Sequence, residues 1–546
     1  MLDHTRIRVF LALLMLAACS AGVMTFLPDA SSFVSNPSLI AKLPPWRREP
    51  IPLITSPTPE RLYELRLRAR TFPELAPVIV DVSGQPTIVH TVKAGDNLGG
   101  LANRYLPQTV FMTTGELESA IRQANPSWTE GHLQPGQQLV IPGIETAPNA
   151  DLRPAPRPKN AEIRAIYLTG WTAGSAHGIE LIRRWKGLGG NAVVFDLKDF
   201  DGLVTVAFSH PLAPEKQRPP IRSLSKLVRF LRRLGLQSIG RIALFRDEQI
   251  ATHHPELAVQ SRRAKGPWRE NGKQVWTDPS RREVQDYNIA LAAYAARRGV
   301  DEIQFDYVRF PAEGDQADAR FAIETEQPTW TRSQVITDFL RRAYDELHSL
   351  GVLVSLDVFG VMAWARPVDL AHTGQKIEDM ARQCDVLSPM IYPSHFFGMD
   401  GYDKPGDAPE HFIGESMDRF RKVTAGTDVV LRPWLQAFAW RTKTYSPDYV
   451  HIQLRVARAK GGIGFLFWNA RNDYSVPFRA ISEKSIVASR ALREEKLKPV
   501  GDESVPPPAH ANPPSSPHNE ETLTQQLPTP AAKSPAPQEA GLQYAR

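Results

Sequence analysis

The sequence predicts an α/β protein, a closed (β/α)8 barrel of the TIM-barrel type preceded by a small βααβ module. Eight short runs rich in β-branched and aromatic residues recur between residues 163 and 467, and amphipathic stretches separate them. Strict alternation of strands and helices is typical of a parallel sheet. A glycine-rich phosphate loop after the first strand would favour an open doubly wound sheet, and the sequence has no such loop there.

Each barrel element is bounded by small residues or glycine turns. Helices are expected between the strands, and the number of strand–helix units fits the size range of one barrel. The expected strands are Ile163–Leu168, Ala192–Leu197, Gln237–Leu244, Glu302–Tyr307, Val352–Val358, Val386–Ile391, Val429–Leu435 and Ile463–Phe467. The expected helices include Leu224–Leu234, Arg281–Arg297, Ser333–Leu350 and Met417–Val423.

Composition divides the 546 residues into segments of different character. A hydrophobic fraction of 42% and a charged fraction of 23% are those of a globular protein with a real core. Proline-rich stretches mark the borders, and the last of them is expected to be disordered. The expected segments are an export signal or anchor (1–27), a spacer (28–86), the module (87–144), a linker (145–160), the barrel (161–498) and a proline-rich tail (499–546).

The N-terminus has the order of an export signal, with basic residues before an uncharged stretch. Within that stretch, Leu16-Ala17-Ala18-Cys19 resembles the bacterial lipobox, which implies lipidation of Cys19. An uncleaved signal anchor is the alternative, because the apolar run continues to Leu27 and is about long enough to span a bilayer. Both interpretations predict a membrane-tethered protein outside the cytoplasm, in the periplasm or at the cell surface.

Charge and cysteine content argue against several classes of partner. The net charge of +6 is spread along the chain, so nucleic-acid binding is not predicted. Cys384 is left without a disulfide partner, and no histidine or cysteine spacing typical of zinc is present. The sequence therefore predicts neither a metal nor a cofactor.

The small module has a strand at 88–92, helices at 96–105 and 115–125, and a strand at 138–141. Its two ends, His90-Thr91-Val92-Lys93-Ala94-Gly95-Asp96-Asn97-Leu98 and Leu133-Gln134-Pro135-Gly136-Gln137-Gln138-Leu139-Val140-Ile141-Pro142, resemble a LysM domain. The resemblance implies binding of N-acetylglucosamine-containing glycans such as peptidoglycan. The matching positions are Gly95, Asp96, Asn97 and Leu98, with Asn97 in place of the usual Thr or Ser.

Polar and aromatic residues follow most of the predicted barrel strands. Chemistry in such barrels takes place at the carboxyl ends of the strands, where carboxylates are expected to converge and aromatic rings can stack on sugars. The candidate substrate-binding residues are Asp196, Lys198, Asp199, Arg246, Arg309, Tyr392, His395, Gln436, Trp468 and Asn469.

Three motifs in the barrel resemble a family of glycosyl hydrolase-like domains of otherwise unknown function. They are Phe195-Asp196-Leu197-Lys198-Asp199, Trp276-Thr277-Asp278-Pro279 and Phe305-Asp306-Tyr307-Val308-Arg309-Phe310-Pro311. The resemblance covers nearly the whole barrel and implies the fold and a glycan-processing class. A chitinase assignment is rejected, because Leu203 stands where the chitinase motif has its glutamate.

Glycoside hydrolysis requires one ionised carboxylate and one that carries a proton. In α-amylase-like barrels these groups end strands four and five, which are the positions of Asp306 and Asp357. Arg309 and Lys198 are expected to keep Asp306 ionised, and the apolar neighbours of Asp357 to keep it protonated. The alternative is a structural Asp306–Arg309 ion pair, with Asp357 capping a turn.

The leading hypothesis is an envelope-tethered glycoside hydrolase acting on a cell-wall or extracellular polysaccharide. A catalytically inactive glycan-binding or scaffold protein is the alternative from another class. A deacetylase or lyase is a third, and the absence of metal-ligand spacing argues against the former.

Overall fold

The computed structural model describes residues 79–80, 86–128, 131–145, 152–213 and 218–482. The predicted signal segment with Cys19, most of the spacer, and the proline-rich tail lie outside the described residues. No helix in the described ranges is long and apolar enough to cross a membrane. Two compact units are present, a small one that contains strands β1 to β3 and a large one that contains the barrel.

The small module has the predicted βααβ order, preceded by one more short strand. Its elements are β1 (Ile79–Val80), β2 (Pro86–Thr91), α5 (Leu98–Tyr105), η3 (Leu106–Gln108), α6 (Thr114–Ala124) and β3 (Gln138–Ile141). The strands form an antiparallel sheet in the order β1-β2-β3. After α6, the Asn125 side chain donates to the carbonyl of Val140 at 2.8 Å and accepts from the Val140 amide, also at 2.8 Å. Asn125 thereby joins the end of the second helix to the closing strand.

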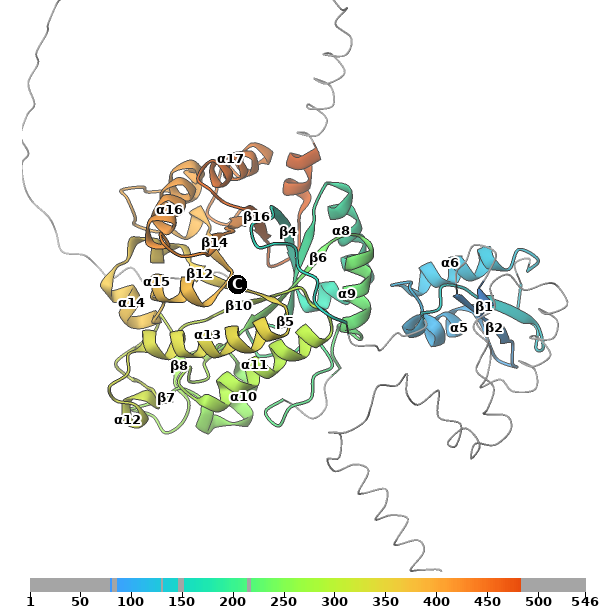
Figure 1. Ribbon diagram of the computed structural model, residues 1–546, viewed down its shortest axis with the longest axis horizontal. Coiled ribbons are helices and arrows are strands. Elements are labelled where there is room, and N and C mark those ends of the chain that lie inside the picture. Colours follow the sequence, from blue (N-terminus) through green and yellow to red (C-terminus); the bar gives the residue numbers. More distant parts are fainter. Residues whose placement is uncertain (1–78, 81–85, 129–130, 146–151, 214–217, 483–546) are drawn as a thin grey trace, which may run out of the picture. The chain divides into compact units, whose positions relative to one another are not determined.

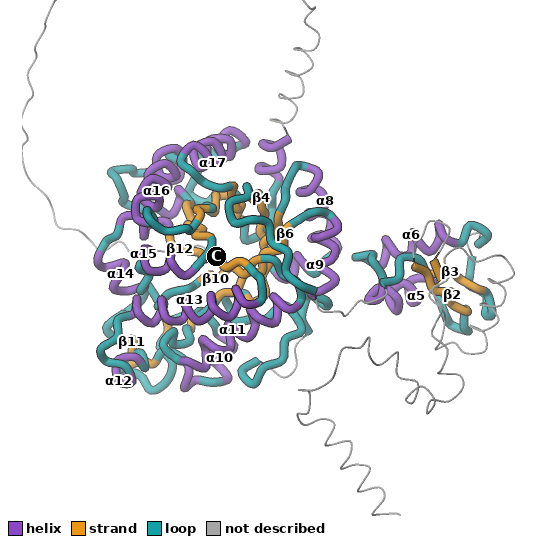
Figure 2. Tube along the Cα trace, in the orientation of Figure 1, coloured by secondary structure: helices purple, strands orange, loops and turns teal. Residues whose placement is uncertain are grey.

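Parallel strands form a closed barrel, which confirms the predicted fold (Figures 1 and 2). The ring has eight places, because β14 and β15 together fill one of them. The strand order is β12-β10-β6-β5-β4-β16-β15-β13-β14, and pairing of β12 with β13 closes the ring. The strands are β4 (Ile163–Leu168), β5 (Ala192–Lys198), β6 (Gln237–Ala243), β10 (Glu302–Asp306), β12 (Leu353–Phe359), β13 (Val386–Ile391), β14 (Val430–Leu431), β15 (Trp434–Gln436) and β16 (Gly464–Trp468). The predicted seventh strand is split into β14 and β15 around Pro433, which has no amide hydrogen to donate to a ladder.

Helices surround the strands (Figure 2). Several begin at a Ser or Thr whose side chain accepts from a backbone amide of the first turn, as Ser175, Ser223, Thr331 and Ser446 do. The helices are α7 (Gly170–Ala173), α8 (Ala176–Gly187), α9 (Leu224–Arg233), α10 (Glu248–His253), α11 (Arg282–Arg297), α12 (Ile323–Glu326), α13 (Arg332–Ser349), α14 (Pro367–Thr373), α15 (Ile377–Met380), α16 (Pro409–Val423) and α17 (Pro447–Ala459). Short strands β7 (Gln260–Ser261), β8 (Arg269–Glu270), β9 (Gln274–Val275) and β11 (Ala319–Arg320) lie in the connections on either side of α11 and β10.

The barrel interior contains buried charges below its mouth. Glu302 begins β10, and Arg432 lies between β14 and β15. The Arg432 Nη1 atom donates to both Glu302 carboxylate oxygens at 2.9 Å, and both side chains are fully buried. Gln237, at the start of β6, donates to the same carboxylate at 2.9 Å. The interior is therefore tied together by ionic and hydrogen bonds as well as by apolar packing.

Candidate active site

A group of inward-facing residues lies at the carboxyl ends of the barrel strands, and we call it the inner ring. Side chains alternate between the two faces of a strand, so residues two apart share a face. Tyr167 belongs to an apolar cluster with Val194 and Ile239, which identifies the inner face of β4, β5 and β6. The inner ring consists of Tyr167, Asp196, Arg241, Asp306, Asp357, Trp434 and Trp468, and its members are buried except for the half-buried Trp468.

Arg241 bridges two carboxylates of the inner ring. Its Nη1 atom donates to Asp196 at 2.5 Å, and its Nε and Nη2 atoms donate to one oxygen of Asp306 at 3.0 and 2.6 Å. All three side chains are almost completely buried. Charge-assisted hydrogen bonds of this kind are short and directional, so the guanidinium fixes both carboxylates and offsets their charge.

Tyr167 and Trp468 complete the surroundings of Arg241. The Tyr167 hydroxyl donates to the second oxygen of Asp196 at 2.5 Å. Burial and the neighbouring Asp196 raise the pKa of Tyr167 well above its usual value, so the phenol keeps its proton. The Trp468 ring stacks on Tyr167 with centroids 4.1 Å apart, and the guanidinium lies 5.1 Å from the Trp468 ring. Aromatic faces thus cover a cation whose hydrogen bonds go to carboxylates.

Asp306 is held in a fixed orientation at the end of β10. The carboxylate oxygen that does not contact Arg241 accepts from the Tyr307 amide at 2.6 Å. Tyr307 adopts φ 50°, a left-handed conformation that is uncommon for a bulky residue. This local strain is compatible with a functional position, where the surrounding structure enforces an unusual backbone.

Asp357 lies level with Asp306 on the neighbouring strand. The parallel register pairs Phe305 with Leu356, so the next residue on each strand is an aspartate. Trp434 donates to Asp357 at 2.6 Å. Burial raises the pKa of Asp357 well above its usual value and the charge of Asp306 adds to this, while Arg241 and Trp434 act in the opposite direction. The structure therefore contains a carboxylate bonded to a cation beside a carboxyl group that favours its proton.

Asp196 gives the fold a predictable pH dependence. Burial raises its pKa to about 7, against the opposing charge of Arg241. A carboxyl whose pKa is higher when folded stabilises the fold fully below its unfolded pKa, about 3.9, and loses that contribution as the pH rises through 7. We expect the free energy of unfolding to fall between pH 5 and pH 8 more steeply in the wild type than in Asp196→Asn. Urea denaturation of both proteins across this range measures the two slopes, and equal slopes would contradict the assignment.

Sequence comparison identifies the two modules. A model described as "Putative glycosyl hydrolase domain" matches residues 165–474, which is more than half of the chain. The chain belongs to this family. A LysM domain model matches residues 90–142, so a LysM domain precedes the glycosyl hydrolase domain, as the sequence motifs predicted.

Several solved structures resemble the chain. A hypothetical protein from Ruminiclostridium thermocellum is 33% identical, with 35% of this chain and 97% of that protein covered and a TM-score of 0.31. The PgaB (BpsB) glycoside hydrolase domain from Bordetella bronchiseptica is 16% identical, with 57% and 94% covered and a TM-score of 0.43. The spore cortex-lytic enzyme SleL from Bacillus cereus is 11% identical, with 73% and 97% covered and a TM-score of 0.37. No curated protein matches the chain in sequence.

Four of the sequence-predicted binding residues lie beside the inner ring of this glycosyl hydrolase domain. Asp199 follows β5, and burial raises its pKa while Arg241 opposes the shift. Arg246 donates to the Tyr307 hydroxyl at 3.0 Å. Tyr392 and His395 follow β13 with ring centroids 5.3 Å apart, and burial lowers the pKa of His395 to about 4. At neutral pH, His395 is therefore uncharged.

The sequence predicts that two basic residues contact Asp306, and neither of them does. Lys198 is fully buried and pairs with Asp247 at 2.6 Å, because a register shift between Asp196 and Lys198 changes the direction of its side chain. The Arg309 guanidinium lies 4.7 Å from the Trp276 ring and 4.4 Å from the Phe359 ring. Arg241 replaces both as the cation at Asp306, so the alternative of an Asp306–Arg309 ion pair is also wrong.

Gln436 and Asn469 have structural contacts. Gln436 is fully buried and donates to the Phe438 carbonyl and the Thr442 hydroxyl, both at 2.9 Å, which braces the loop after β15. Asn469 donates to the Ala437 carbonyl at 2.6 Å and to the Asp473 carbonyl at 2.8 Å. These contacts position the loops at the mouth and leave few polar atoms for a substrate.

The sequence candidates include neither Arg241 nor Tyr167. Both lie within predicted strands, whereas most candidates are the last residues of a strand or lie in the turn that follows it. A charged residue inside a buried strand was the available signal for Arg241, since Gln237, Ile239 and Arg241 share one face by their spacing of two.

The predicted glycan-binding residues of the LysM domain form its first turn. Gly95 adopts φ 86° and is exposed. Asp96 accepts from the Lys93 amide at 2.8 Å and contacts His90 at 2.9 Å. The Asn97 side chain accepts from the Gly100 amide at 2.8 Å and so caps α5, which begins at Leu98. The Asn that stands in place of the usual Thr or Ser is thus the N-cap of α5 in this domain.

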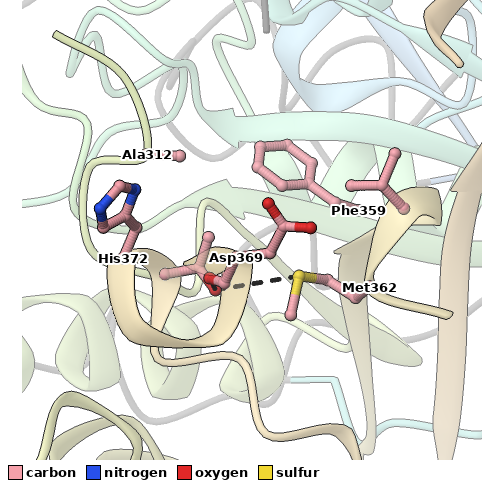
Figure 3. A pocket seen from close by; sticks show the side chains of 7 residues that line it. Ala312, Phe359, Met362, Asp369 and His372 are labelled. Atoms are coloured by element: carbon pink, nitrogen blue, oxygen red, sulfur yellow. Dashed lines mark hydrogen bonds between the residues drawn. The ribbon is translucent and has the colours of Figure 1, made fainter. Parts of the chain in front are cut away.

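A small pocket lies between the loops that follow β10 and β12 (Figure 3). Its lining includes Ala312, Phe359 and Met362, with Asp369 and His372 from α14. The Asp369 carboxylate is paired with Arg366 at 2.6 Å. We interpret this pocket as part of the loop packing beside the mouth. Within the described ranges, no group of three or more His, Cys, Asp or Glu side chains could hold a metal ion.

Proposed function

We propose that this protein hydrolyses a glycosidic bond of a cell-wall or extracellular polysaccharide, with Asp306 and Asp357 as the catalytic pair. One observation carries the proposal: two carboxyl groups lie side by side on neighbouring strands, and their electrostatic surroundings differ. Asp306 is bonded to Arg241, whereas burial raises the pKa of Asp357 well above its usual value. Pairs of carboxyl groups whose environments favour different protonation states supply the base or nucleophile and the acid of glycoside hydrolysis.

The reaction assigns one role to each group. Asp357 transfers its proton to the glycosidic oxygen as the bond from that oxygen to C1 breaks. Asp306 either attacks C1 and is later released by water, or removes a proton from the water that attacks C1. In both cases one water is consumed, one sugar gains a free hydroxyl and the other gains a reducing end. Arg241 holds Asp306 in place during either sequence.

In this proposal, the LysM domain and the N-terminus determine where in the cell envelope the protein is held. LysM binding to N-acetylglucosamine-containing glycan would keep the barrel beside the cell wall. Lipidation of Cys19 or an uncleaved signal anchor would tether the protein to the membrane. Mass spectrometry of the N-terminal peptide from the producing cell, looking for a lipid-modified Cys19, distinguishes the two kinds of tether.

Release of reducing ends is the direct test of catalysis. We expect the full chain to release reducing ends from purified peptidoglycan or from another envelope polysaccharide. Asp306→Asn and Asp357→Asn are each expected to lower the rate by about a thousandfold or more, because each removes a group that acts only in the transition state. The rate is measured with a panel of polysaccharides at pH 6 to 7.

Asp345→Asn is the matched control, since Asp345 is an exposed residue on α13. It should retain wild-type activity. Binding without release of reducing ends from any substrate would overturn the glycosidase proposal in favour of an inactive glycan-binding or scaffold protein. Activity that survives in both Asp306→Asn and Asp357→Asn would overturn the assignment of the pair.

A further inference from the structure

Two stacks of arginine on aromatic rings lie on opposite sides of the barrel mouth. Arg246, after β6, lies 4.5 Å from the centroid of the Phe200 ring, which follows β5. Arg441 lies 4.5 Å from the ring of Trp440, which follows β15, and 3.9 Å from Phe397, which follows β13. Around the barrel, β5 and β6 lie opposite β13 and β15. A polysaccharide that crosses the mouth from one stack to the other passes over the barrel axis, with β10 and β12, which carry Asp306 and Asp357, along one side of its path.

The Arg441 stack has the features of an anion-binding platform. Arg441 is exposed, and it forms no ion pair with any carboxylate in the described part of the chain. Some exposed arginines of the barrel, such as Arg263 and Arg366, are paired with carboxylates, whereas Arg441 is held, among the described residues, only by contacts with aromatic rings. An arginine held on aromatic rings is oriented but keeps its charge and its donors, which suits bidentate contact with a carboxylate.

The loop after β15 is built to hold Arg441 in this position. Arg441 adopts φ 50°, a left-handed conformation that costs free energy at a residue with a side chain. The next residue, Thr442, is buried and accepts from Gln436 at 2.9 Å. Trp440 and Phe397 are half-buried, so their rings are partly open to a sugar. The strained residue therefore lies on a braced loop between two aromatic side chains.

The Arg246 stack differs in its electrostatic surroundings. Arg246 contacts the Tyr307 hydroxyl, and the nearby Asp199 and Glu313 carboxyls both feel its charge. These acidic groups reduce the attraction for an anion on that side of the mouth. Phe200, 40% exposed, still offers a ring face to a sugar there. The anion-binding side is therefore that of Arg441.

We propose that the substrate glycan is acidic, and that Arg441 on its Trp440–Phe397 platform binds a sugar carboxylate on the β13–β15 side of the cleaved bond. This inference rests on the proposed glycosidase function and narrows its substrate class. Two sources share the required chemistry: peptide-free peptidoglycan strands, whose lactyl groups are free carboxylates, and polymers of uronic acids with ring carboxylates.

Binding of matched glycans tests the proposal without turnover. The full chain carrying Asp306→Asn is titrated calorimetrically with peptide-free peptidoglycan strands and with uronic-acid oligosaccharides, each as the free acid and as the methyl ester. If Asp306→Asn does not fold, Asp357→Asn serves as the background. Adding Arg441→Gln should weaken binding of one acidic glycan by about tenfold or more, the usual size of a lost charged hydrogen bond, and change binding of its ester less than about twofold.

The control is Arg164→Gln, an exposed arginine near the opposite end of β4, which should change neither affinity. The acidic glycan that loses affinity identifies the source. An equal loss for acid and ester would show that Arg441 serves only packing, and no loss for either acid would overturn the subsite. If the wild type releases no reducing ends while Arg441→Gln still weakens only the acidic glycan, the glycosidase proposal fails and the subsite stands.

Discussion

Arg241→Gln is expected to lower kcat by about 100- to 1,000-fold with a smaller change in KM. Arg241 donates three hydrogen bonds, one to Asp196 and two to Asp306. Glutamine cannot carry the charge or reach both carboxylates, so Asp306 loses the group that orients it and offsets its charge. If Asp306 has its proposed catalytic role, loss of a preorganised electrostatic contact there has an effect of this size. Steady-state kinetics on the best polysaccharide measures the split between kcat and KM.

The same substitution is expected to destabilise the barrel. Removing one member of a buried ionic network leaves uncompensated charge and costs about 3–5 kcal/mol. The double variant Arg241→Gln with Asp196→Asn should recover part of this stability, because one of the two carboxylates is then neutral, while kcat stays low. Recovery of kcat together with stability would show that Arg241 acts only on folding and would contradict its role in positioning Asp306.

The second large effect is a loss of stability, expected when the buried Glu302–Arg432 pair below the barrel mouth is changed. Arg432→Met should lower the free energy of unfolding by about 3–5 kcal/mol, because it leaves the Glu302 carboxylate buried without its cation. Adding Glu302→Leu removes that charge, so the double variant should regain most of the loss and can equal the wild type. Urea unfolding followed by tryptophan fluorescence gives the three free energies relative to the wild type.

The variants at Arg432 and Glu302 also test where in the barrel activity is located. Glu302 and Arg432 lie below the inner ring, so the double variant should retain kcat within about threefold if the ring keeps its geometry. If the double variant is as unstable as Arg432→Met, the buried pair itself stabilises the barrel and the charge-compensation argument fails.

The strands were predictable from sequence because each is a short run of β-branched or aromatic residues bounded by turns. Most predicted ends agree with the structure within one residue, from β4 at Ile163–Leu168 to β13 at Val386–Ile391. The split at Pro433 is not part of the prediction, which has one continuous strand over Val429–Leu435. The physical signal was present, since proline cannot donate to a strand partner.

The candidate site was only partly predictable. Asp306 and Asp357 occur at the ends of strands, and counting strands was enough to place them on neighbouring ones; their catalytic role stays a prediction. The partner of Asp306 could not be found by proximity in sequence, because Arg241 is 65 residues away from it and meets it across the β6–β10 pair. Lys198, close to Asp196 in sequence, is directed elsewhere by a register shift that no sequence pattern signalled.

The charged layers inside the barrel also constrain how such a sequence can change. Arg241 is paired with two carboxylates and Arg432 with one. A variant in which only one member of either group is replaced is therefore expected to be less stable than the wild type. Compensating changes must then arise together or in a background with stability to spare. Exposed faces of α13 and α17 carry no such requirement. Redesign of this barrel for a new substrate is therefore expected to succeed first in the loops around the mouth, with the interior charges retained as a set.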